Sequence, residues 1–148
     1  MEEVIISPYI LAIVLGWTLS QLIKSIIAMT RHRRLSIRGT MFVSGGMPSS
    51  HSATIMAVWT TILIMDGVTS GLFGLASVVA LIVLYDAVKV RRSSGEQGAA
   101  VVALLEETKS TIARPRVAMG HTPTEVLVGS LLGVSVGILV WWLTTFAF

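Results

Sequence analysis

Two long runs of uncharged, mostly apolar residues constrain this chain more than any other feature. Val4 to Ile23 and Val126 to Phe148 contain no charged side chain. Each is long enough to cross the hydrocarbon core of a bilayer as a helix, which takes about 20 residues. The composition agrees, because 53% of the residues are hydrophobic and only 13% are charged. We therefore predict an integral membrane protein, and the absence of cysteine excludes disulfides and thiolate metal sites.

Two shorter apolar runs lie between these ends. Ala53 to Met65 stops at Asp66, and Gly71 to Tyr85 stops at Asp86. Their length is compatible with short membrane spans and also with a re-entrant hairpin. We interpret them as two further spans and leave open whether both cross the bilayer fully.

The connection between the third and fourth runs, residues 91–120, is the longest in the chain. Ser93 and Glu96 have the spacing of a capping box, which marks a helix start. Ala99 to Glu107 then predicts a short helix lying at the membrane interface. The predicted fold is an all-α bundle of about four transmembrane helices plus this interfacial helix, in one domain over residues 1–148.

The distribution of charge orients the predicted spans. The chain has eleven lysines and arginines, and all of them follow the first or the third apolar run. The opposite face has only acidic residues, namely Glu2, Glu3 and Asp66. The positive-inside rule then places both basic segments in the cytoplasm and both termini outside. This topology prediction depends most on Arg33, Arg34 and Arg38, because the other cations could serve to bind phosphate.

Two short stretches each place a histidine beside a predicted helix start. One contains Ser49, Ser50 and His51, and the other runs from His121 to Glu125. The N-terminus of a helix presents free N–H groups and a positive dipole end, so it receives an anion well. Histidine can act there as a nucleophile or a general acid. Both stretches fall on the basic side, so we predict that they form two halves of one phosphate site.

Three groups of residues, taken in order, resemble the signature motifs of the type 2 phosphatidic acid phosphatase superfamily. They are Lys24 with Arg31, the Pro48–His51 stretch, and His121 with Glu125. This superfamily includes lipid phosphatases and vanadium haloperoxidases. Together with Asp86–Gln97, the pattern is similar to a small divergent branch of it.

The resemblance implies a role for each matching residue. His121 would attack phosphorus and become a phosphohistidine, Glu125 would hold its other ring nitrogen, and His51 would protonate the leaving oxygen. Fixed cations and donors stabilise the charge on the phosphoryl oxygens in the transition state. In this family those groups would be Lys24, Arg31, Ser49 and Ser50. The chemistry needs no metal or other cofactor.

The sequence departs from the family pattern at the third motif. The arginine expected six residues before His121 is replaced by Pro115. The cation could come instead from Arg114 or Arg116, which flank this proline, or from Arg91 or Arg92. We favour Arg92 slightly, because the neighbouring Asp86 could hold it still. Asp86, near the end of a span, is interpreted as orienting such an arginine and not as a metal ligand.

Each of these residues also has a purely structural interpretation. Glu125 could complete a capping box with Thr122, and Ser49 or Ser50 could cap the second helix. Lys24 could snorkel from the end of the first span towards the interface. The four-residue repeat of Gly129, Gly133 and Gly137 favours close helix packing over chemistry.

We therefore expect a metal-independent phosphatase that acts on a lipid phosphate or diphosphate at the cytoplasmic surface. A site at headgroup depth meets amphiphiles first, so membrane lipids are the expected partners and nucleic acid is not. The alternative is a phospholipid-binding or assembly protein that keeps the anion site without turnover. A homodimer through the glycine face, defined by Gly129, Gly133 and Gly137, is also expected.

Overall fold

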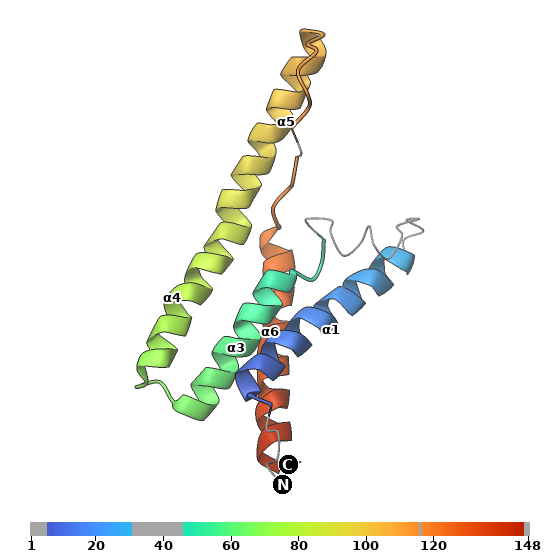
Figure 1. The fold of residues 1–148 in the computed structure, drawn as a ribbon. Coiled ribbons are helices and arrows are strands. Elements are labelled where there is room, and N and C mark those ends of the chain that lie inside the picture. Colours follow the sequence, from blue (N-terminus) through green and yellow to red (C-terminus); the bar gives the residue numbers. More distant parts are fainter. Residues whose placement is uncertain (1–5, 31–45, 116, 147–148) are drawn as a thin grey trace.

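The computed structural model describes residues 6–30, 46–115 and 117–146, and these form an all-α bundle without strands (Figure 1). Its elements in chain order are α1 (Pro8–Thr30), α3 (Ser50–Asp66), α4 (Gly71–Tyr85), η1 (Asp86–Val90), α5 (Arg91–Glu107) and α6 (Pro123–Phe146). Apart from Ile6 and Ser7, the described residues of every apolar run lie in one of these helices. The predicted helical membrane bundle is confirmed.

Within the described part of the chain, three helical segments are long and apolar enough to cross a membrane: Pro8–Thr30, Gly71–Glu107 and Pro123–Phe146. The remaining helix, α3, has 17 residues, which is at the lower limit for a transmembrane helix. It runs alongside the others and contacts α1, α4 and α6. Helix α3 is therefore at the centre of the bundle.

The segment after α4 differs from the prediction. Helix α5 begins at Arg91, eight residues before the expected start at Ala99, and continues from α4 through η1 without a break. Ser93 and Glu96 lie inside this helix and form no capping box. Their side chains bond along the helix to Gln97 and Arg92 instead. The long helix projects beyond the rest of the bundle, and the chain returns along it to α6 (Figure 1).

Glycines on α6 allow its backbone to approach α3 closely. A Cβ atom added to Gly133 would lie 2.4 Å from the Ala53 carbonyl oxygen, and one on Gly137 would lie 2.6 Å from Thr60 Cβ. One on Gly129 would lie 2.5 Å from the Ser49 carbonyl oxygen. The glycine face is thus occupied by α3 of the same chain, which corrects its expected role as the surface for a homodimer.

The start of α1 and the end of α6 lie at one end of the bundle (Figure 1). At the other end, α1 and α4 finish while α3 and α6 begin. Four stretches that are far apart in sequence therefore meet at this second end, around Lys24, Ser49, Asp86 and His121. Each of these stretches carries residues singled out above as phosphate-site candidates.

Candidate functional site

The first turn of α3 is fixed by Ser49. Its hydroxyl oxygen accepts hydrogen bonds from the Ser52 N–H at 3.4 Å and from the Ser52 hydroxyl at 2.9 Å. This side chain is therefore the helix N-cap, as the structural interpretation proposed. The Ser49 N–H donates to the Glu125 carbonyl oxygen at 3.1 Å. That bond holds the starts of α3 and α6 together.

Glu125 serves two functions at the start of α6. Its Oε2 lies 3.1 Å from Nδ1 of His121 and also accepts the Thr122 N–H at 3.1 Å. In return, the Glu125 N–H donates to Thr122 Oγ1 at 3.3 Å. This is a capping box. The capping interpretation and the histidine-holding interpretation of Glu125 are therefore both compatible with one conformation.

The environment of His121 favours a neutral imidazole. The side chain is only 6% exposed, and burial lowers the pKa of His121 against the opposing effect of Glu125. The positive charges of Lys24 and Arg91 lower this pKa further. A carboxylate beside Nδ1 favours the tautomer with its proton on that nitrogen. Nε2 then keeps its lone pair.

The backbone of His121 is held by the π-helical turn η1. The His121 N–H donates to the Ala87 carbonyl oxygen at 3.1 Å. A π turn contains one residue more than an α turn and so disturbs the regular ladder of helix hydrogen bonds. Next to this bond, a Cβ on Gly120 would lie 2.4 Å from the Arg92 backbone nitrogen. The chain can approach η1 this closely only because residue 120 is glycine.

The same π turn pairs Asp86 with Arg91. The Arg91 N–H donates to the Asp86 carbonyl oxygen, five residues earlier. The Arg91 Nε donates to Oδ2 of the Asp86 side chain. The aspartate therefore holds Arg91 and not the Arg92 that the sequence favoured. No sequence signal marks η1 as a π turn, so sequence reasoning missed it.

The other candidate arginines have different positions. Arg92 pairs with Glu96 at 3.1 Å, and Arg114 pairs with Glu106 at 3.2 Å. Of these three arginines, only Arg91 has a charge that lowers the pKa of His121. Arg31 and Arg116 lie outside the described residues.

Lys24 and His51 complete the group. Lys24 is 9% exposed near the end of α1, so it is buried and does not snorkel towards the surface, and the Glu125 carboxylate attracts its charge. His51 is exposed in the first turn of α3, within electrostatic reach of His121 and Arg91. Ser50, beside it, is 7% exposed. The structure thus gathers two histidines, a carboxylate and two cations at one end of the bundle.

The site combines a buried imidazole with a second imidazole that is open to solvent. The charges of Lys24 and Arg91 both act on the buried ring. Among the described residues, no group of three or more histidine, aspartate or glutamate side chains is placed to hold a metal ion.

Comparisons with known proteins agree with the membrane fold. A family model described as "Divergent PAP2 family" matches residues 6–136. A protein of Bacillus subtilis (strain 168), called "Uncharacterized membrane protein YuiD", is 34% identical over 106 residues. That alignment covers 62% of this chain and 67% of the relative. No solved structure matches the chain.

Proposed function

Because the chain belongs to the divergent PAP2 family, we propose that it is a membrane phosphatase for a lipid phosphate or diphosphate. The observation that carries the proposal is the contact between His121 Nδ1 and Glu125 in a buried site beside Lys24. A histidine held this way presents Nε2 as a nucleophile while the carboxylate stabilises the positive charge that develops on the ring.

The proposed reaction has two steps. His121 Nε2 attacks phosphorus, and the bond between phosphorus and the lipid oxygen breaks while His51 donates a proton to that oxygen. Water then attacks the phosphohistidine and gives a proton to His51, which releases inorganic phosphate and restores both histidines. The water proton replaces the one that left with the lipid. His51 therefore acts as general acid and then as general base.

Three positively charged side chains would stabilise the phosphoryl oxygens in this reaction. Lys24 and Arg31 are two of them, and Arg91, held by Asp86, is proposed as the third in place of the missing family arginine. A cation fixed in advance lowers the barrier more than one that must be ordered during the reaction. The buried hydroxyl of Ser50 and the first turn of α3 would supply further donors.

The decisive experiment measures phosphate release by the purified protein in detergent. The substrate panel should contain phosphatidate, phosphatidylglycerophosphate and a polyprenyl diphosphate. We expect turnover of at least one of them, with acid-labile phosphate on wild-type protein quenched early. His121→Ala should lose more than nine tenths of that turnover while remaining folded. Retention of more than a tenth of it would remove His121 as the nucleophile.

The proposal places the site at the cytoplasmic face and both termini outside, in accordance with the basic segments. The chain has no cysteine, so single cysteines can report topology. One placed between Arg34 and Arg38 should resist impermeant thiol reagents in intact cells, and one beside Asp66 should react. The reverse pattern would move the site, and its pool of substrate, to the outer face.

A second candidate function is favoured by one observation. Pro115 stands where the family pattern has an arginine, and a site without that cation could bind phospholipid headgroups without turning them over. In that case the purified protein would release no phosphate from any member of the panel. It would still bind these lipids, and the His121→Ala variant would release no phosphate either.

A further inference from the structure

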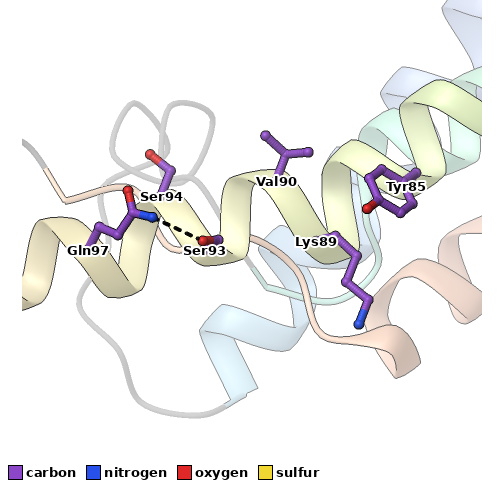
Figure 2. A pocket seen from close by; sticks show the side chains of 6 residues that line it. All are labelled: Tyr85, Lys89, Val90, Ser93, Ser94 and Gln97. Atoms are coloured by element: carbon purple, nitrogen blue, oxygen red, sulfur yellow. Dashed lines mark hydrogen bonds between the residues drawn. The ribbon is translucent and has the colours of Figure 1, made fainter.

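The long helix that runs from α4 into α5 carries a hollow on its surface, lined by both polar and apolar groups. It has a cavity volume of about 500 Å³. Figure 2 shows that its lining side chains all come from this helix: Tyr85, Lys89, Val90, Ser93, Ser94 and Gln97. Four of them repeat at a spacing of four residues, which places them along one face of a helix. We call this surface the Lys89 hollow.

The Lys89 hollow is separate from the histidine site. Ala87 is buried and gives its carbonyl oxygen to the His121 N–H. Lys89 follows two residues later and therefore points about half a turn away around the helix axis. It is exposed, whereas Ala87 is 3% exposed. A molecule bound at Lys89 would thus lie on the opposite side of the helix from the nucleophile.

The chemistry of the Lys89 hollow suits an anion. Arg91, Arg92 and Arg114 each have a carboxylate partner. Lys89 has none within 4.0 Å among the described residues. No acidic side chain lines the hollow, and its polar groups are hydroxyls, an amide and the ammonium group. The Gln97 amide donates to Ser93 Oγ at 3.2 Å, which leaves the Ser93 proton free to donate outward.

The position along the helix indicates which anion is available. From Gly71, where α4 begins, Lys89 is 18 residues along the helix, or about 27 Å at the usual rise. A hydrocarbon core is about 30 Å thick, so Lys89 reaches the depth of the lipid headgroups. Tyrosine, here Tyr85, is typical of that depth. Leu81 and Ile82, one turn earlier, are 69% and 63% exposed and offer an apolar surface for acyl chains.

We propose that the Lys89 hollow binds the headgroup phosphate of an anionic phospholipid from the membrane leaflet in which Lys89 lies. Lys89 pairs with the phosphate, Ser93 and Gln97 bond the headgroup, and the acyl chains lie along Leu81 and Ile82. This lipid is a bound neighbour of the protein and not the molecule that His121 attacks. The inference therefore does not depend on phosphatase activity.

The test measures binding of phosphatidylglycerol and phosphatidylcholine to the purified full-length protein by native mass spectrometry. One basic residue near a membrane surface is worth about 1 kcal/mol of attraction, or about fivefold in affinity. We expect a preference for phosphatidylglycerol that Lys89→Gln lowers about fivefold and Lys89→Arg retains. Lys109→Gln is the matched control, because Lys109 is exposed beyond the end of α5 and outside the hollow.

Three results would overturn the proposal. Equal loss in Lys89→Gln and Lys109→Gln would show a general charge effect. Disappearance of the preference in His121→Ala would place the lipid at the histidine site. Displacement of the lipid by millimolar inorganic phosphate would make free phosphate the ligand. The proposal is supported if His121→Ala keeps the preference for phosphatidylglycerol and only Lys89→Gln loses it. This result holds whether or not the protein releases phosphate.

Discussion

The α3–α6 pair and the long helix formed by α4, η1 and α5 contribute to the site in different ways. In the pair, glycines on α6 bring two backbones into contact. In the long helix, α4 buries only Ala76 and Ala80, and a Cβ on Gly74 would meet nothing within 4 Å. The pair therefore places the backbone of His51 at the start of α3 close to Glu125, which contacts His121. The long helix presents most of its surface outward and reaches the site through η1.

The difference shows how a small bundle can hold site residues in a closely packed pair of helices while a third, long helix keeps most of its surface exposed. Ser49 and Glu125 are joined by a backbone hydrogen bond within a closely packed pair of helices, and the Glu125 carboxylate in turn contacts the His121 ring. The long helix adds Arg91 and the Ala87 carbonyl at a single junction beside Gly120. We expect changes in the pair to affect chemistry and stability, and changes in the long helix to act only through this junction.

The largest effect is expected in the pair, at His51. As a general acid it should contribute a factor on the order of 10² to 10⁴ in rate. His51→Ala should reduce hydrolysis of an alkyl phosphate by that factor and reduce hydrolysis of an activated aryl phosphate much less, because a good leaving group needs no proton. Comparing kcat for both substrates checks this. Equal losses would assign His51 a structural or phosphate-binding role.

The next effect concerns the junction with the long helix. Arg91→Ala should lower kcat by about 10² to 10³, as expected for the loss of one preorganised donor to transition-state charge. Arg92→Ala and Arg114→Ala are matched controls. They break exposed ion pairs worth about 1 kcal/mol at most, so kcat should stay within about fivefold. Steady-state kinetics of the three variants measure these changes in kcat. A larger loss of kcat in Arg92→Ala than in Arg91→Ala would favour Arg92 as the third cation, as the sequence analysis did.

A stability comparison separates the two regions directly. Gly133→Ala would place Cβ 2.4 Å from the Ala53 carbonyl oxygen, and overpacking of this kind costs about 1 to 3 kcal/mol. Gly74→Ala on α4 meets nothing and should be neutral or stabilise the helix by up to about 1 kcal/mol. Thermal unfolding in detergent measures both. Similar melting temperatures for the two variants would contradict the close packing of α3 and α6.

The smallest effect is a shift in titration. Arg91 lowers the pKa of His121, so Arg91→Ala should raise it. If turnover needs neutral His121, the acid side of the kcat/KM profile then moves to higher pH. NMR titration of the His121 ring gives the same direction without turnover. Arg92→Ala should leave the titration unchanged, and an equal shift in both variants would mean that the electrostatic effect is not specific to Arg91.

The sequence predicted the helices well because each is a local property of an apolar run. The run Gly71–Tyr85 coincides with α4. The contact of His121 with Glu125 was also expected, as an implication of the family resemblance, and the structure places Glu125 Oε2 3.1 Å from His121 Nδ1. The predicted start of helix α5 at Ala99 was wrong, because the polar residues from Arg91 to Gln97 were interpreted as a new helix start. In the structure they continue a helix that leaves the apolar region.

What the sequence determined by itself was the membrane setting, the all-α fold and the motif residues, because hydropathy and short-range spacing are properties of the chain alone. The tertiary structure decided which arginine meets Asp86 and what covers the glycine face. Arg91 and not Arg92 pairs with Asp86 because one π turn changes the helical phase by a residue, and the composition of Asp86–Val90 does not reveal that turn. Gly129, Gly133 and Gly137 meet α3 because the two helices pack within one chain, and the repeat alone does not identify its partner.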